Sequence, residues 1–332
     1  MANENHHHTS SAMRAWQSKT PGVDAMVLAD VPRPSPREGE ALVQVAAAAI
    51  NFSDVLMLDD KYQIRPPRPF IPGQELAGTV VEVGPGCNLK PGDNIASKVE
   101  WGAFAEYACV SQTMAMRAPD GVSLIDAAAL PVTYTTSYVA LTESTKLRAN
   151  ETVLILAAVG GVGVAAIQIA CHMGARVIAA VGGGDKVELA RSLGAHEAID
   201  YGTENWIENV RSLTKGRGVD VIIDPVGGGT ATDALRLLAW EGRYLVVGFA
   251  SGKIPAIPGN RLLLKRASAI GVYWNHDRDR EMLGRVSKGL YAMAEAGALR
   301  PHIGGRYTFD ELPTALTDLA NRKTVGKVII TF

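Results

Sequence analysis

The glycine-rich segment in the middle of the chain carries its clearest chemical signal. The residues concerned are Ala158, Gly160, Gly161, Val162 and Gly163. They follow the apolar run 153–157 in an A-x-G-x-x-G pattern, and a helix is expected over 165–170. Glycines at this spacing let backbone N–H groups approach a pyrophosphate, and the partial positive charge at a helix N-terminus favours the anion. The pattern predicts a dinucleotide site, although a strand-to-helix turn without a ligand can have it too.

The residues around this turn alternate between short apolar runs and helical patterns. The apolar runs are 153–157, 176–181, 198–200, 219–224, 242–248 and 267–272, and the helical patterns that separate some of them include 185–193 and 231–238. Such alternation is typical of a parallel sheet that is covered by helices on both faces. We therefore predict an α/β domain with a Rossmann-type, doubly wound parallel sheet.

The end of the second apolar run bears on which nicotinamide coenzyme the site takes. NAD sites usually have Asp or Glu there, about 20 residues after the glycine turn, to accept a hydrogen bond from the ribose 2′-OH. This chain has Ala180, Val181 and Gly182 instead, and Lys186 follows where a cation could meet a 2′-phosphate. Asp185 could serve NAD, but we favour its interpretation as a helix cap. NADP is predicted, with a solvated surface lysine as the alternative for Lys186.

The part of the chain before residue 135 has a different character. Short strand-like runs at 41–45, 78–83 and 104–110 are separated by turns rich in Pro and Gly, and the C-terminal part returns to a helix over 280–297 and a strand over 327–332. We expect a β-rich domain interrupted by the nucleotide domain, with the active cleft between them. The expected boundaries are 1–12 for an expression tag that precedes a natural start at Met13, 13–136 for the catalytic domain, 137–276 for the NADP-binding domain and 277–332 for the return to the catalytic domain.

Composition narrows the class of protein. The chain has 332 residues, enough for two domains with cores of their own, and its 47% hydrophobic and 20% charged residues are ordinary for a globular enzyme. A formal net charge of −1 argues against a nucleic-acid partner, and no apolar stretch approaches the roughly 20 residues of a membrane span. Cys87, Cys109 and Cys171 are far apart and odd in number, which argues against a disulfide framework. With no signal peptide after Met13, we expect a cytoplasmic protein.

Six motifs, taken together and in order, resemble the medium-chain dehydrogenase/reductase superfamily and, within it, the zinc-independent quinone oxidoreductases. They are Asn51–Phe52–Ser53–Asp54, Pro72–Gly73–Gln74–Glu75–x–Ala77–Gly78, Thr135–Thr136–x–Tyr138, the 157–163 turn, Asp224–x–Val226–Gly227–Gly228 and Gly326–Lys327–Val328. The resemblance covers essentially all of 13–332. It implies a Rossmann sheet inserted in a GroES-like catalytic domain, and a homodimer that pairs through the sheet edge at 267–272.

Two positions depart from the zinc-dependent branch of that superfamily. That branch has Cys where Asn51 stands and His where Gln74 stands, and side-chain amides are poor zinc ligands. The cysteine-rich lobe that holds a structural zinc in that branch is also absent from this sequence. Glu75 and Asp54 remain, but a carboxylate pair without nitrogen or sulfur partners is weak support for a metal. We therefore expect a protein without zinc or any other metal.

The resemblance also implies a set of catalytic residues. Asn51, Asp54 and Thr136 are expected near the nicotinamide, where the Asn51 amide can donate to a developing oxyanion and Asp54 supports the site through hydrogen bonds. Tyr62 falls where these relatives place a tyrosine at the substrate, and its phenol could donate to the reduced oxygen. The alternatives are that Asn51 and Asp54 only cap a turn and that Tyr62 only packs at the surface.

On the coenzyme side the resemblance implies a 2′-phosphate pocket formed by Gly182, Lys186 and Tyr201. The triple glycine 182–184 departs from the family and could loosen this preference, and Tyr201 could be an ordinary tyrosine at a strand end. Phe249 is expected at the cleft, with buried packing as its alternative. The coenzyme-binding residues implied further along the chain are Asp224, Val226, Gly248, Phe249 and Lys327.

These expectations lead to an NADPH-dependent reductase of quinones or other conjugated carbonyl compounds that transfers a hydride directly to a small-molecule substrate. An enoyl-type reductase of an acyl-CoA or an enone is the nearest alternative, because members of the superfamily catalyse both reactions. A non-catalytic, NADPH-binding structural or RNA-binding protein is a minor alternative. The near-zero net charge argues against RNA.

Overall fold

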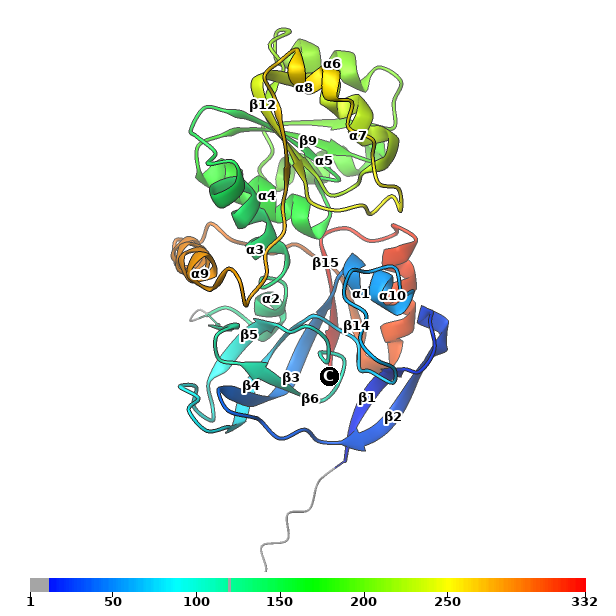
Figure 1. Ribbon diagram of the computed structural model, residues 1–332, viewed down its shortest axis with the longest axis vertical. Helices are drawn as coiled ribbons and strands as arrows, with labels where there is room; N and C mark the ends of the chain where they lie inside the picture. Colours follow the sequence, from blue (N-terminus) through cyan, green and yellow to red (C-terminus); the bar gives the residue numbers. More distant parts are fainter. Residues whose placement is uncertain (1–11, 119–120) are drawn as a thin grey trace, which may run out of the picture. The chain divides into compact units, whose positions relative to one another are not determined.

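The computed structural model describes residues 12–118 and 121–332, which form two compact units (Figure 1). The first unit extends to Pro131 and includes Arg306–Lys323 and Val328–Phe332, and the second comprises Val132–Gly305 and Thr324–Lys327. The expected tag, 1–12, lies outside the described residues except for Ala12, which begins the first strand. No helix in the described part of the chain is both long enough and apolar enough to cross a bilayer.

The second unit is built on a six-stranded parallel sheet, and the predicted doubly wound fold is confirmed. Its strands are β8 (Thr152–Leu156), β9 (Arg176–Val181), β10 (Glu197–Asp200), β11 (Val219–Asp224), β12 (Leu238–Val246) and β13 (Ser268–Gly271). The order across the sheet is β10-β9-β8-β11-β12-β13. Counted from β8, this is the Rossmann order 3-2-1-4-5-6, in which ligands bind at the carboxyl ends of the strands.

The helical segments of the second unit come before, between and after these strands in the chain. They are α3 (Thr133–Tyr138), the π-helical η2 (Val139–Ser144), α4 (Gly161–His172), the 3-10 turn η3 (Gly184–Lys186), α5 (Val187–Ser192), α6 (Trp206–Leu213), α7 (Gly228–Ala234), η4 (Leu235–Leu237), α8 (Gly259–Leu263) and α9 (Arg280–Glu295). The helix predicted over 231–238 begins earlier, at Gly228, and has ended by Leu238. The reason is that Leu238 already pairs with Val219 in the sheet and must be extended.

The first unit consists of a β-hairpin and a larger, mainly antiparallel sheet. The hairpin is β1 (Ala12–Ser18) with β2 (Met26–Pro32); the other strands are β3 (Glu40–Ile50), β4 (Glu75–Val83), β5 (Asn94–Lys98), β6 (Tyr107–Ser111), β7 (Ala115–Arg117), β14 (Ile303–Thr308) and β15 (Lys327–Thr331). The strand order is β14-β15-β3-β4-β5-β7, and β6 also pairs with β3. The helical segments are η1 (Val23–Ala25), α1 (Phe52–Leu58), α2 (Leu124–Ala128), η5 (Phe309–Glu311) and α10 (Leu312–Ala320).

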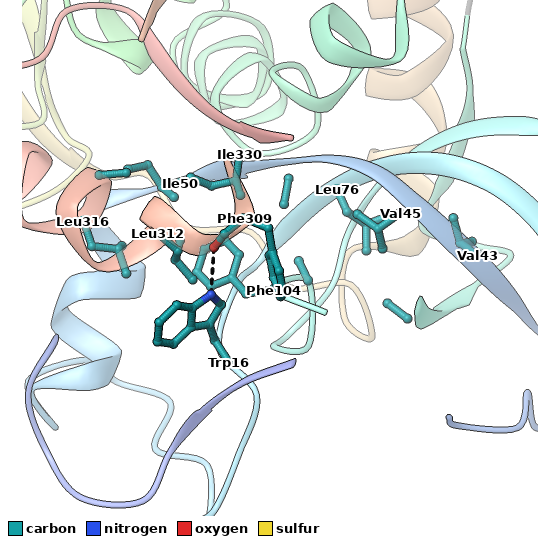
Figure 2. Packing of buried hydrophobic residues seen from close by; sticks show 14 of the residues in the cluster. Trp16, Val43, Val45, Ile50, Leu76, Phe104, Phe309, Leu312, Leu316 and Ile330 are labelled. Atoms are coloured by element: carbon teal, nitrogen blue, oxygen red, sulfur yellow. Dashed lines mark hydrogen bonds between the residues drawn. The ribbon is translucent and has the colours of Figure 1, made fainter. Parts of the chain in front are cut away.

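The core of the first unit joins residues from both ends of the chain (Figure 2). Trp16 packs edge-on against Phe309, and its indole N–H donates a 2.8 Å hydrogen bond to the Phe309 carbonyl. Phe104 and Leu76 are fully buried in the same cluster. Burial of such side chains contributes about 1.5–3 kcal/mol each, so this packing fixes the end of β3, where the chain turns into α1.

The boundaries of the two units differ from the expected ones. We expected the chain to return to the catalytic domain at residue 277, but α9 clusters with the second unit and the return begins at Arg306. The reason is close packing between α9 and α3, where a Cβ at Gly289 would collide with the Tyr138 hydroxyl. Only glycine allows the two helices to approach this closely.

Candidate active site

The glycine turn between β8 and α4 is tightly packed against the strand that precedes it. Gly160 is the N-cap of α4, and a Cβ at Gly163 would lie 2.5 Å from the backbone atoms of Ala157 and Ala158. The first N–H groups of α4 have no acceptor within the helix, because the helical pairing begins only one turn later. A turn of this kind offers donors that fit a pyrophosphate, and so the residues present fit a dinucleotide.

The segment around Lys327 lies directly beside this turn. The Gly326 N–H donates a 2.6 Å hydrogen bond to the Val159 carbonyl, and Gly160 and Gly326 form a parallel bridge. A Cβ at Gly161 would lie 2.9 Å from Cδ of Lys327, whose side chain is buried. The structure thus brings together two motifs that are far apart in the sequence, the glycine turn and Gly326–Lys327.

The residues expected to form the 2′-phosphate pocket lie at the ends of β9 and β10. A Cβ at Gly182 would be 2.9 Å from the Tyr201 hydroxyl, so these two residues are close neighbours. Lys186 is half-buried and ends η3. The interpretation of Asp185 as a helix cap is wrong. The N-cap position belongs to Gly183, whose φ is 124°, and η3 therefore begins at Gly184, two residues earlier than a helix capped by Asp185 would begin.

Sequence reasoning missed Asp200 in this region. It was assigned only to the third strand of the sheet, yet its carboxylate accepts hydrogen bonds from the backbone N–H groups of Gly183 and Gly202. The signal that could have identified it is its place at the carboxyl end of a parallel strand, beside Tyr201.

Asp224 acts on the backbone of the turn that follows β11. Its side chain is 1% exposed, and one oxygen accepts hydrogen bonds from the N–H groups of Val226 at 2.7 Å and Gly227 at 2.9 Å. The other oxygen accepts a hydrogen bond from the Tyr244 hydroxyl. Burial and the adjacent carboxylate raise the pKa of Tyr244, which keeps its phenol protonated as a donor. Asp224 therefore shapes this turn, and Val226 is a buried member of the core of the second unit.

Gly248 and Phe249 lie close to the same turn after β11. The Gly248 N–H donates a 3.3 Å hydrogen bond to the Asp224 carbonyl, and the Ala250 N–H donates one of 3.0 Å to the Pro225 carbonyl. A Cβ at Gly227 would lie 3.1 Å from the Phe249 ring, and the φ of Gly227 is 71°. Two neighbouring loops at the carboxyl ends of β11 and β12 are thereby fixed to each other.

Thr136 lies on α3 in the second unit. Its hydroxyl oxygen accepts a 3.1 Å hydrogen bond from the indole N–H of Trp274. A threonine hydroxyl has one hydrogen to donate and two acceptor positions, and this bond uses an acceptor position. Trp274 thus orients the Thr136 hydroxyl without using its hydrogen.

In the first unit, Asn51 and Asp54 lie at the start of α1 beside a second buried acid. The Asp54 carboxylate accepts a 2.7 Å hydrogen bond from the Asn51 backbone N–H, as in a capping box. The Asn51 side-chain amide donates at 3.0 Å to the carboxylate of Glu75, and its contact with the Ala49 carbonyl is longer, at 3.4 Å. Asp54 and Glu75 are fully buried. Capping, which was the alternative role for Asn51 and Asp54, is therefore part of what they do.

Lys98 belongs to the same cluster and was also missed. It is the direct cross-strand partner of Glu75 in the antiparallel pair of β4 and β5, so the two side chains emerge on one face of the sheet. Burial lowers the pKa of Lys98, and the charges of Glu100, Asp54 and Glu75 oppose this effect. Gln74, one of the two positions that depart from the zinc-dependent branch, accepts a hydrogen bond from the Ser53 hydroxyl.

Tyr62 lies just beyond α1. It is half-buried and packs against the core of the first unit, and its backbone N–H donates to the Leu56 carbonyl at 3.1 Å. Within 12–118 and 121–332, no three His, Cys, Asp or Glu side chains are grouped so that they could hold a metal ion.

Comparison with known proteins agrees with this architecture. Residues 37–120 match the alcohol dehydrogenase GroES-like domain, and residues 161–288 match the family described as zinc-binding dehydrogenase. The chain is 36% identical to the mouse (Mus musculus) quinone oxidoreductase-like protein 2 over 330 residues, which is 96% of this chain and 94% of that protein.

Two solved structures are similar over nearly the whole chain. Mycobacterial Rv1454c complexed with NADPH is 32% identical, with a TM-score of 0.88 over 96% of this chain and 100% of that one. A quinone oxidoreductase from Pseudomonas syringae pv. tomato is 28% identical, with a TM-score of 0.88 over 97% of this chain and 100% of that one. The predicted resemblance is confirmed: the chain belongs to the quinone oxidoreductase-like group of the medium-chain dehydrogenase/reductase superfamily, a family of oxidoreductases.

Proposed function

We propose that the protein is an NADPH-dependent reductase of quinones or other conjugated carbonyl compounds, which works by direct hydride transfer and without a metal. The observation that carries the proposal is the glycine turn at α4, with Lys327 on one side and Gly163 packed on the β8 backbone. The names of the relatives agree with it, since one similar structure contains NADPH and another is a quinone oxidoreductase.

The second unit supplies the groups that would bind the coenzyme. The N–H groups at the start of α4 would hold the pyrophosphate, while Lys186 and Tyr201 would bind the 2′-phosphate. Asp224, Gly248 and Phe249 would keep two loops in place, and Thr136 would present its hydroxyl in the orientation that Trp274 gives it. When bound, NADPH supplies a hydride from C4 of its dihydronicotinamide ring.

The first unit would act on the substrate. The Asn51 amide, which donates to the Glu75 carboxylate at 3.0 Å and to the Ala49 carbonyl at 3.4 Å, would also be the donor to the oxygen that gains charge. Asp54 holds the backbone of Asn51, and Tyr62 would donate its phenol hydrogen to the same oxygen, with water replacing that proton. A quinone then leaves as a hydroquinone, having gained one hydride and one proton.

Amides at Asn51 and Gln74 support the metal-free part of the proposal. Both side chains are engaged by neighbours in the first unit, Asn51 by Glu75 and Gln74 by Ser53. Amide groups are poor ligands for zinc, which prefers thiolate, imidazole or carboxylate.

The test is a substrate panel with the purified protein, in which coenzyme oxidation is followed with NADPH and with NADH. The panel contains simple ortho- and para-quinones, an enone and crotonyl-CoA, and metal content is measured on the same sample. We expect oxidation of NADPH by at least one quinone, and activity that survives a chelator. Exclusive turnover of the CoA ester would favour an enoyl-type reductase, and coenzyme binding without turnover of any substrate would favour a non-catalytic role.

We further propose a homodimer that pairs through β13. This strand ends the sheet of the second unit, and its residues Ser268, Ala269 and Gly271 are exposed. Nearby large side chains are exposed as well, with Leu263 at 79% and Trp240 at 61%. Light scattering should give twice the mass of the chain.

A cytoplasmic location is also proposed, since all three cysteines are free thiols, as is usual in a reducing compartment.

A further inference from the structure

Asp200 ends β10 directly beside the glycine loop that follows β9. In the parallel pairing of the two strands, Asp200 is the partner of Val181, the residue before Gly182. The Tyr201 N–H donates a 2.9 Å hydrogen bond to the Val181 carbonyl, which continues the same pairing by one residue. Asp200 is therefore fixed at the carboxyl edge of the sheet, next to the residues assigned above to the 2′-phosphate.

The Asp200 carboxylate joins the two loops at this edge. One of its oxygens accepts hydrogen bonds from the Gly183 N–H at 3.0 Å and from the Gly202 N–H at 2.7 Å. The other oxygen lies 3.9 Å from the point where a Cβ of Gly184 would be. The carboxylate is half-buried, and it occupies backbone donors that could otherwise face an anion.

The charges around this loop are mixed. Lys186 is the one basic residue of the segment 182–186, whereas Asp185 precedes it in the sequence and the Asp200 carboxylate contacts the same segment at Gly183. An Asp185 oxygen would lie 2.6 Å from a Cβ at Gly183, so it too is beside the loop. A 2′-phosphate carries up to two negative charges and is repelled by a carboxylate, whereas the 2′-hydroxyl of NADH is neutral and can donate to one.

We propose that Asp200 is a specificity-determining residue that limits the preference of this site for NADPH over NADH. The proposal rests on the function proposed above, because it concerns the same coenzyme site. The negative charge of the Asp200 carboxylate would weaken the binding of the phosphorylated coenzyme. The hydrogen bonds that this carboxylate accepts from Gly183 and Gly202 would keep the loop in place.

The first test measures binding without turnover. Adenosine 2′,5′-bisphosphate and 5′-AMP are titrated by calorimetry into the full-length protein and into Asp200→Asn, which keeps an oxygen acceptor and removes the charge. The variant should bind the bisphosphate about three- to tenfold more tightly, as expected when one charge several ångströms from a dianion is removed, with 5′-AMP binding unchanged. The gain should shrink at high salt, because screening weakens a charge effect but leaves a change in loop shape untouched.

The second test compares kcat/KM for NADPH and NADH with one quinone. The NADPH:NADH ratio should rise in Asp200→Asn, chiefly through a lower KM for NADPH. Asp200→Ser, which also removes the charge and keeps an oxygen, guards against a folding defect that is particular to one variant. Glu197→Gln is the matched control, because Glu197 begins β10 roughly 10 Å away, pairs with Arg176 and should leave the ratio unchanged.

An unchanged or lower NADPH:NADH ratio in both variants, together with unchanged bisphosphate affinity, would overturn this inference and leave the proposed function intact. Failure of both the wild-type protein and the variants to bind either adenine nucleotide would overturn the inference together with the proposed coenzyme site.

Discussion

Glu75 and Lys98 are direct cross-strand partners on β4 and β5, in the cluster that also contains the buried carboxylate of Asp54. Despite this acidic surrounding, the pKa of Lys98 is lowered, because burial outweighs the attraction of Glu100, Asp54 and Glu75. The ammonium form is therefore less favourable in the folded protein than in the unfolded chain.

We expect Lys98→Met to be at least as stable as the wild-type protein near neutral pH, because the pKa of Lys98 is lowered even with the attraction of the carboxylates included, and Met has no charge to desolvate. The folded pKa of Lys98 lies below 10.5, so the unfolded chain binds more protons between these two values. Lys98 therefore makes wild-type stability rise with pH through that window, and Lys98→Met should lose this rise. Thermal melts between about pH 7 and pH 10 measure both effects. Clear destabilisation of Lys98→Met at neutral pH would contradict this ranking of burial over attraction.

Substitutions of Asn51 distinguish a catalytic role of its side chain from a role that is limited to capping α1. Asn51→Asp replaces the donor to Glu75 with a carboxylate, and two like charges at hydrogen-bond distance repel each other. We expect kcat/KM to fall about hundredfold or more in Asn51→Asp and about tenfold to hundredfold in Asn51→Ala, which only removes the donor. Steady-state kinetics with one quinone, together with thermal melts, give the comparison. If both variants keep wild-type kcat/KM, Asn51 only caps α1.

Two alanine substitutions in the glycine turn should differ in their effect on stability. A Cβ at Gly163 would lie 2.5 Å from the backbone of Ala157 and Ala158, which cannot move without shifting β8, whereas a Cβ at Gly160 would lie 3.3 Å from the Ala157 oxygen. Gly163→Ala should lose about 1–3 kcal/mol of unfolding free energy or more, and Gly160→Ala clearly less. Urea denaturation of the two variants measures the difference. Equal stability of the two would show that α4 and β8 are less tightly packed than the structure has them.

We predict that substitutions of Asp224 and Tyr244 are coupled in their effects on the free energy of unfolding. The Tyr244 hydroxyl donates to the carboxylate that also holds Val226 and Gly227, and all of this is buried. A double-mutant cycle of Asp224→Asn and Tyr244→Phe should give a coupling of about 1–3 kcal/mol, as expected for a buried hydrogen bond to a charged group. Coenzyme affinity should fall in Asp224→Asn, because the turn loses its support. Additive effects of the two substitutions would speak against this shared network.

The sequence predicted the sheet of the second unit well, because its signals are local. The apolar runs 176–181 and 219–224 coincide with β9 and β11, and the glycine turn stands where it was expected, between β8 and α4. Helix ends were less predictable. We expected a helix to reach residue 238, but β12 begins at Leu238. The reason is that Leu238 pairs with Val219 in the sheet, and this tertiary contact outweighs local helix propensity.

From the sequence we could name candidate site residues that belong to a motif. We missed residues that reach the site only through the pairing of neighbouring strands. Lys98 meets Glu75 through the register of β4 and β5, and Asp200 meets Gly183 through the alignment of β9 and β10. Neither contact leaves a local pattern in the sequence. Asp185 was misinterpreted for a related reason, because the conformation of Gly183 sets where η3 begins.

The most direct test of the central claim is a rapid-mixing experiment with NADPH deuterated at C4. Protein that has been equilibrated with the coenzyme and a chelator is mixed with a para-quinone, and coenzyme absorbance is followed through a single turnover. The account predicts oxidation of NADPH that is slower with deuterium on one face of the ring and unaffected by the chelator. Loss of the reaction with the chelator, or no oxidation of bound NADPH by any quinone, would contradict it.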